Sequence, residues 1–128
     1  MKVINAVFLT LIFTAGAAYG SNESNFITAE QIERQNAINA LLRIDNGPSA
    51  QEAAELNDEL IDKMQGVILD TASKGAYSEC DKLEKEILSG LNIPMKGVPD
   101  DITRDFSLAL SRQVSDRCQA LVSHNVGQ

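Results

Sequence analysis

The sequence predicts an all-α protein: a small four-helix, bundle-like domain in which one disulfide joins the third and fourth helices. Three observations predict it. Residues 28–122 are rich in Ala, Leu, Ile, Glu, Lys and Gln and poor in aromatic residues, a composition that favours helices over strands. Apolar residues recur at spacings of three and four in separate stretches. The two cysteines, Cys80 and Cys118, fall in the last two of these stretches.

The first twenty residues have the pattern of a secretory signal peptide. Lys2 supplies a positive charge, residues 3–18 are almost entirely apolar, and Ala18 and Gly20 are small residues at the two positions that a signal peptidase reads. The apolar run is shorter than the ~20 residues that a bilayer-spanning helix needs. We therefore expect residues 1–20 to be removed. Residues 21–128 would then be exported as a single domain to the periplasm or the extracellular space, without stable membrane insertion.

The charge of the chain restricts its partners. The formal net charge is −7, and removal of Lys2 makes it −8. Nucleic acids and anionic membranes select for clusters of Lys and Arg, so this balance argues against both. A basic protein partner remains, and so does the simpler explanation that the charge keeps the protein soluble.

The two cysteines predict a disulfide, because an exported chain meets an oxidising compartment. A Cys80–Cys118 bridge would close a loop of about 39 residues, for which the chain-entropy model gives roughly 4 kcal/mol. The alternative is a pair of buried free thiols. Two cysteines and one histidine cannot form a tetrahedral zinc site without carboxylates, so we expect no metal. The sequence contains no cofactor-binding motif, so we expect no cofactor.

The first helix is expected to begin at Thr28, after a flexible entry segment over residues 21–26. Thr28 and Gln31 match a capping box, and Ile27 and Ile32 are spaced for a hydrophobic staple. The helix should end at residues 45–48, where Gly47 tolerates a left-handed cap and a proline follows. Its apolar face would contain Ile38, Leu41 and Leu42.

The second helix is expected to span residues 50–74 after a capping box formed by Ser49 and Glu52. Gly66 lies inside it at a cost near 1 kcal/mol relative to Ala, which suggests either a close approach of another helix or a weak point. The apolar pattern of this helix contains Ala53, Leu56, Leu60, Met64, Val67, Ile68 and Thr71.

The third and fourth helices are expected over residues 78–89 and 100–122, with Gly90 ending the third and a frayed tail after residue 123. The fourth would bury Ile102, Phe106, Leu110, Val114, Cys118, Leu121 and Val122. An antiparallel pair brings Cys80 to Cys118 if the connection climbs roughly 12 Å, which nine residues can do.

An acidic row on the second helix is a candidate partner-binding face. Its residues are Glu52, Glu55, Glu59 and Asp62. Like charges at these spacings repel, and only Lys63 is placed to offset them, so a cationic partner would relieve the repulsion. The alternative is an ordinary solvated helix face.

The connection between the third and fourth helices is a second candidate. It presents Ile93, Met95 and Val98 beside two prolines, Pro94 and Pro99, and a restricted apolar loop can enter a partner's groove with little loss of entropy. The alternative is a lid that closes one end of the core.

We expect no enzymatic activity. The only histidine, His124, lies five residues from the end of the chain, where nothing would hold it in a catalytic orientation. The main hypothesis is an exported acidic protein that inhibits or neutralises a basic protein, of which an immunity protein against a secreted toxin would be one case. The alternatives are a helical carrier of an apolar small molecule and an acid-responsive structural or chaperone-like protein. The sequence leaves the oligomeric state open.

Overall fold

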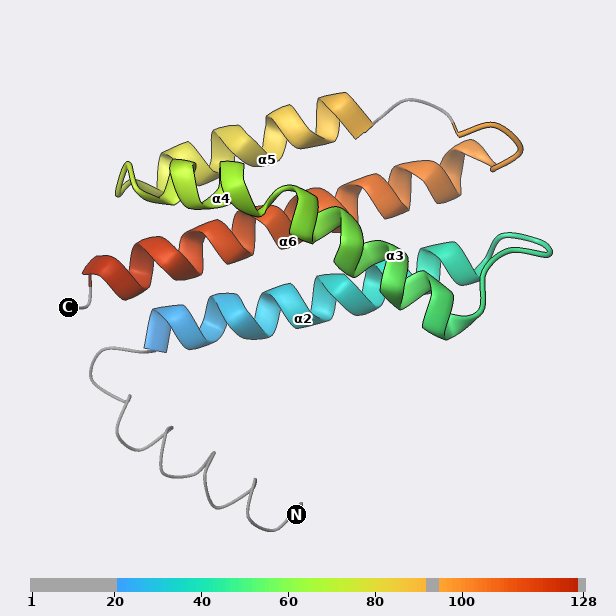
Figure 1. Cartoon of the computed structure of the whole chain (residues 1–128), viewed down its shortest axis with the longest axis horizontal. Coiled ribbons are helices and arrows are strands. Elements are labelled where there is room, and N and C mark those ends of the chain that lie inside the picture. The colour runs from blue at the N-terminus through green and yellow to red at the C-terminus, as the bar shows by residue number, and fades with distance from the viewer. Residues whose placement is uncertain (1–20, 92–94, 127–128) are drawn as a thin grey trace, which may run out of the picture.

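The structure is a computed structural model that describes residues 21–91 and 95–126. The predicted signal peptide lies outside this range. The described residues form five helices: α2 (Ser21–Leu42), α3 (Ala50–Lys63), α4 (Gln65–Ala72), α5 (Tyr77–Leu91) and α6 (Asp100–Val126) (Figure 1). The predicted all-α class is therefore confirmed. The predicted count of four is wrong, because the helix expected over residues 50–74 is two helices.

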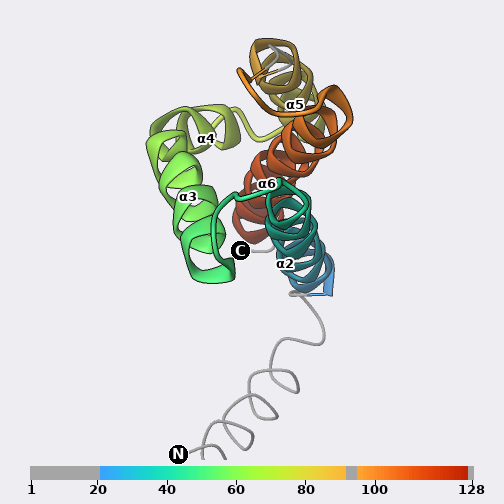
Figure 2. The ribbon, with the colours of Figure 1, turned by 90° about the vertical axis from the view of Figure 1, so that its right-hand side faces the viewer.

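Helix α6 occupies the centre of the domain and contacts each of the other four helices (Figure 2). Its predicted apolar stripe is buried, except that Leu121 is only partly buried. Because neighbours cover it on several sides, polar residues off this stripe are buried too, including Ser107, Ser111 and Gln113. Every buried side-chain nitrogen and oxygen in the described part of the chain has a hydrogen-bond partner.

Helix α2 runs antiparallel to α6 along most of its length. Buried alanines at the contact, Ala37 and Ala40 on α2 and Ala109 on α6, have side chains small enough for a close approach of the two helices. Ion pairs flank this contact near the middle and at the end of α2. Arg117 lies 2.7 Å from Glu30 near the middle, and Arg43 lies 2.7 Å from Asp105 at the end.

Helix α5 is attached to α6 by the predicted Cys80–Cys118 disulfide, whose Cα atoms are 5.7 Å apart. Eleven residues further along α5, the Ser107 hydroxyl donates a hydrogen bond of 3.0 Å to the Leu91 carbonyl. The two helices are thus antiparallel, as expected. The bridge joins the two predicted segments, which are the fourth and fifth of the helices described rather than the third and fourth.

The break between α3 and α4 occurs at Met64, whose backbone angles are φ −94° and ψ 0°. Nothing outside its own helix and chain neighbours lies within 4 Å of the place where a Cβ on Gly66 would be, so no other helix approaches this glycine closely. Helix α3 packs mainly against α2, and α4 packs against α5 and α6. Since the two segments face different neighbours, Leu56 and Val67 are exposed instead of buried, at 40% and 43%.

Several predicted helix ends differ from those in the structure. Helix α2 already includes residues 21–26, so Thr28 lies inside it, and the Ile27–Ile32 staple is wrong because Ile32 is 57% exposed. Helix α5 continues through Gly90, and α6 includes His124. The spacing of apolar residues therefore predicted the buried faces of the helices better than it predicted the residues at which the helices begin and end.

The Ser49 capping box is confirmed. The Glu52 backbone N–H donates to the Ser49 hydroxyl at 3.1 Å, and the Ser49 N–H donates to the Glu52 carboxylate at 3.0 Å. In the turn before it, the left-handed residue is Asn46, with φ 55°, and not Gly47 as predicted. Gly47 is needed for space, because a Cβ there would lie 2.7 Å from the Ile44 Cβ.

Gly47→Ala is expected to lower the free energy of unfolding by about 1–3 kcal/mol, because the new methyl group would overlap Ile44. Urea unfolding of the oxidised protein measures the change. Gly90→Ala is the matched control, since its methyl group would enter open space within α5. Equal stabilities for the two variants would contradict the proposed overlap.

Candidate functional site

The negative charge of the domain is concentrated in one segment. Residues 45–73, which contain α3 and α4 and which we call the acidic arm, hold seven carboxylates and a single basic residue, Lys63. Their net charge is −6. The rest of residues 21–128 holds eleven carboxylates and nine basic residues, a net charge of −2. The arm thus carries three quarters of the net charge of the predicted mature domain.

The four carboxylates of the predicted acidic face are all exposed on α3. They lie on the side of the helix opposite its buried residues Ala53, Asn57 and Ile61. Local contacts use some of them: Glu55 accepts a hydrogen bond from Gln51 at 3.1 Å, and Glu59 lies 3.6 Å from Lys63. The hydrogen bonds from Ser49 lower the pKa of Glu52, which therefore also serves as a helix cap.

Leu56 adds an apolar group to this face. It follows Glu55 and lies one helical turn from both Glu52 and Glu59, and the break at Met64 leaves it 40% exposed. The sequence pattern placed Leu56 in the core, so its exposure is a finding of the structure. An exposed leucine bordered by carboxylates can contact a surface that is apolar at one point and basic around it.

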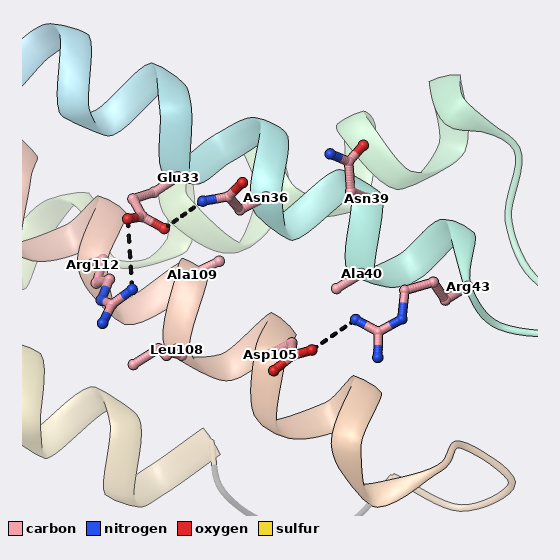
Figure 3. Close-up of a pocket in the computed structure, with 9 residues that line it drawn as sticks. All are labelled: Glu33, Asn36, Asn39, Ala40, Arg43, Asp105, Leu108, Ala109 and Arg112. Atoms are coloured by element: carbon pink, nitrogen blue, oxygen red, sulfur yellow. Dashed lines mark hydrogen bonds and ion pairs between the residues drawn. The ribbon is translucent and has the colours of Figure 1, made fainter.

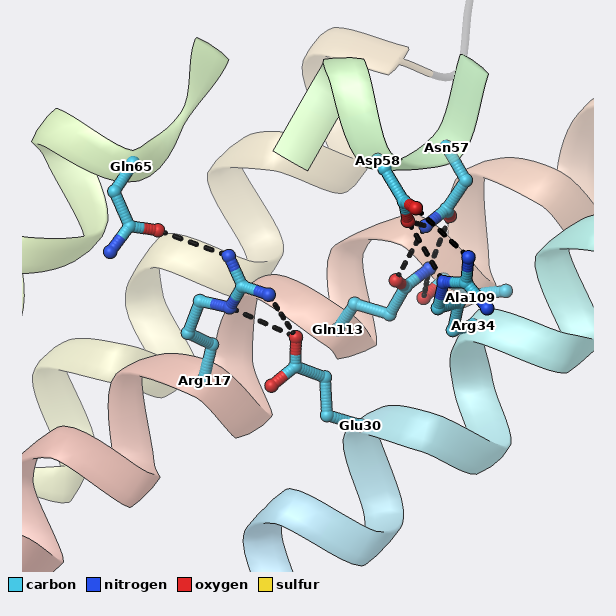
Figure 4. A network of polar contacts seen from close by, with 8 residues as sticks. All are labelled: Glu30, Arg34, Asn57, Asp58, Gln65, Ala109, Gln113 and Arg117. Carbon is cyan, nitrogen blue, oxygen red and sulfur yellow. Dashed lines mark hydrogen bonds and ion pairs between the residues drawn. The ribbon is translucent and has the colours of Figure 1, made fainter. Parts of the chain in front are cut away.

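A buried pair of amides joins α3 to α6 (Figure 4). The Asn57 side chain donates to Gln113 Oε1 at 3.0 Å, and the Gln113 side chain donates back to Asn57 Oδ1 at 2.6 Å. Both residues are fully or almost fully buried. Sequence analysis missed this pair, although Asn57 lies in phase with the buried residues Ala53 and Ile61 and is the one polar residue at those positions.

An ion pair joins α3 to α2 beside these amides. The Arg34 guanidinium donates to both carboxylate oxygens of Asp58, at 2.8 and 2.9 Å (Figure 4). The hydrogen bond from Arg34 lowers the pKa of Asp58, and one from Asn57 adds to the effect. Asp58 is therefore committed to the helix interface and does not belong to the outward acidic face.

Arg117 ties α6 to two other helices at the edge of the same region. It donates to Glu30 on α2 at 2.9 Å and to Gln65 at the start of α4 at 3.1 Å (Figure 4). A hollow of about 450 Å³ lies here, lined by Glu30, Arg34, Asp58, Ile61, Asp62, Gln113 and Arg117. Six of these seven residues are polar or charged, and an apolar ligand needs a more apolar lining.

A second hollow, of about 310 Å³, lies between α2 and α6 (Figure 3). Arg43 and Arg112 lie toward its two ends and pair with Asp105 and Glu33, at 2.7 and 3.8 Å. The other lining residues are Asn36, Asn39, Ala40, Leu108 and Ala109. Its guanidinium groups are already paired with carboxylates, so the hollow has no excess of either charge.

The apolar connection lies apart from the acidic face. Met95 is exposed, Val98 is half-buried, and Ile93 lies outside the described residues. This connection leads into the start of α6 beside α5, whereas α3 lies across the domain near α2 (Figures 1 and 2). The structure therefore does not bring Met95 and Val98 into one surface with the acidic face.

Asp116 on α6 is an unusual carboxylate. Burial, together with the negative charges of Glu33, Glu84 and Glu30, raises its pKa to about 6, and the positive charge of Arg112 opposes the shift. Protonation of Asp116 therefore favours the folded state. This effect opposes opening of the helices at low pH, which the acid-responsive hypothesis requires.

Three further features of the described residues are the surroundings of His124, the grouping of metal-binding side chains and the apolar character of the helices. His124 approaches Glu23 at 3.4 Å across the α6–α2 contact and lies near the end of α6. Within residues 21–91 and 95–126, no three His, Cys, Asp or Glu side chains are grouped to hold a metal ion. No helix in this part of the chain has the length and apolar character needed to cross a bilayer.

Comparisons with known proteins add no family. No family model matches the chain, and neither curated proteins nor solved structures show a match. Functional inference therefore rests on the geometry and charge of the site.

Asp116→Asn is expected to stabilise the protein near neutral pH. The pKa of Asp116 is higher in the folded chain than its usual value, so its contribution to stability is present below about pH 4 and is lost as the pH rises through about 6. Asparagine mimics the protonated form and should remove this loss. Urea unfolding across this range, with Asp70→Asn as the exposed control, should show a gain near pH 8 that vanishes near pH 4. A gain that does not depend on pH would contradict the assignment.

Proposed function

We propose that this chain is an exported protein that binds and neutralises a basic protein through the acidic arm. An immunity-type inhibitor of a secreted toxin or hydrolase is one case. One observation carries the proposal: residues 45–73 hold a net charge of −6, and their outward carboxylates are exposed on one helix face.

The distribution of charge supports binding rather than solubility alone. Outside the arm, arginines and carboxylates pair across the helix contacts, as in Arg43–Asp105 and Arg117–Glu30. On the outward face of α3 the only basic residue is Lys63, and its pair with Glu59 is exposed and therefore weak. The unbalanced field of this face would steer a basic protein and speed its association.

The proposed contact surface is Glu52, Glu55, Glu59 and Asp62 around Leu56. A matching partner would present lysines and arginines around a small apolar depression, so that charges set the orientation and Leu56 is removed from water. Met95 and Val98 remain a separate predicted contact, because their part of the connection does not adjoin this face, and Ile93 remains a prediction from the sequence.

Export remains part of the proposal. The apolar run over residues 3–18 supports it, and the Cys80–Cys118 disulfide is compatible with an oxidising compartment. The carrier and acid-responsive alternatives have less support, because both hollows are lined mainly by polar or charged groups and Asp116 favours the folded state in acid.

Reversing two charges on the face tests the proposal. Glu55→Lys with Glu59→Lys should lose a basic protein that the immobilised wild-type chain captures from the extracellular or envelope fraction of its host. Association with that protein, once purified, should slow by roughly tenfold or more at low salt, because steering depends on the local field. Surface plasmon resonance measures both rate constants.

The matched control is Asp81→Lys with Glu86→Lys on the exposed side of α5, which changes the net charge equally. This control should retain capture and most of the association rate. If both double variants lose capture and association rate equally, the effect depends on net charge and not on the acidic face. If the α3 variant binds as the wild type does, the acidic face takes no part in binding.

A further inference from the structure

We propose that α3 is a hinged element that detaches locally from the domain, pivoting at residues 64–66, while α2, α5 and α6 stay folded together. This inference goes beyond the proposed function and does not depend on it, because it concerns the isolated chain. Three observations support it. The helices are attached to α6 by contacts of unequal strength, α3 docks through hydrogen bonds and an ion pair, and the glycine that follows α3 has open space around it.

The helices are held to α6 by contacts of different strength. A disulfide fixes α5, and an extended, closely packed contact with buried alanines holds α2. Helix α3 makes sparser contacts: it fully buries Ala53, Asn57 and Ile61, and the apolar residues Ala54, Leu60 and Met64 are partly buried against the core. Detaching α3 therefore breaks fewer contacts than detaching α2, and no disulfide opposes it as one opposes the detachment of α5.

The remaining attachment of α3 is polar. Asn57 and Gln113 exchange two hydrogen bonds in the buried contact, and Arg34 binds Asp58 at a site where both side chains are at least two-fifths exposed. Water can replace each of these hydrogen bonds when the helix separates, so their net contribution to attachment is modest. We call these two pairs the latch. The latch specifies where α3 docks without holding it strongly.

The pivot lies where α3 passes into α4. Met64 ends α3, and its side chain forms no capping hydrogen bond at the start of α4. Gly66 follows two residues later, is exposed, and has no atom within 4 Å of the position that a Cβ would occupy. A glycine in open space can change its backbone angles without a clash, so the backbone can rotate at Gly66, while Arg117 holds the neighbouring Gln65 side chain at 3.1 Å.

Hydrogen exchange of the oxidised full chain, followed by mass spectrometry or NMR, reports the motion. A detached helix of 14 residues is marginal in water, so the amides of α3 exchange whenever it separates. The inference predicts that α3 exchanges through a local opening, at a rate well above that of the central amides of α2, α5 and α6. Exchange of α3 at the same rate as α6 would mean global unfolding and would overturn it.

Two glycine variants distinguish local opening of α3 from a change in the stability of the whole domain. Gly66→Ala should slow exchange of α3 by about fivefold, the factor that corresponds to the roughly 1 kcal/mol difference in helix propensity between Gly and Ala. Gly90→Ala makes the same change near the end of α5, also in open space, and should leave α3 unchanged. Equal slowing of α3 in both variants would overturn the inference.

The latch is tested by near-isosteric replacement. Asn57→Leu with Gln113→Met replaces both amides with apolar groups and should slow exchange of α3 while leaving α5 unchanged. Gln113→Met alone leaves the buried Asn57 Oδ1 without its hydrogen-bond donor, although the Asn57 side chain still donates to Asp58, and should speed exchange of α3. If neither variant changes the exchange rate of α3, the amide pair does not hold this helix. The two glycine variants still test the pivot if a latch variant fails to fold.

Discussion

The burial of α6 on several sides is the constraint on which the rest of the structure depends. A helix in contact with all four others can expose little of its surface, so its polar side chains must find partners inside the domain. Ser107 bonds the end of α5, and Gln113 bonds α3. The same helix carries Cys118, and small residues along it allow α2 to approach closely. The residues on each side of α6 therefore help to fix the position of the helix that packs there.

This arrangement separates strong packing from negative charge. Helices α2, α5 and α6 combine apolar packing, one disulfide and paired charges, whereas the acidic arm has a net charge of −6. Within the arm, α3 holds five of the seven carboxylates and docks partly through the Asn57–Gln113 hydrogen bonds, whereas α4 packs against α5 and α6 with Ile68 and Ala72 buried. The face proposed to bind a partner and the helix proposed to detach are consequently the same element.

Sequence analysis predicted what depends on local chemistry and periodicity. The helical class, the Ser49 capping box and the apolar stripe of α6 were predictable because spacing and propensity report them directly. The disulfide followed from two cysteines and an expected compartment. The break at Met64 was not predictable, because each half of that segment turns toward a different neighbour. The Asn57–Gln113 pair was missed for the same reason, since its partners are 56 residues apart in the chain.

The most direct test of the central claim is native mass spectrometry of the protein purified from its own host without reducing agent. The account predicts a chain that begins at Ser21, with a mass about two hydrogens below that of the reduced form, in complex with a basic protein that dissociates at high salt. A chain that retains residues 1–20, or one that carries a bound lipophile and no protein, would contradict the account.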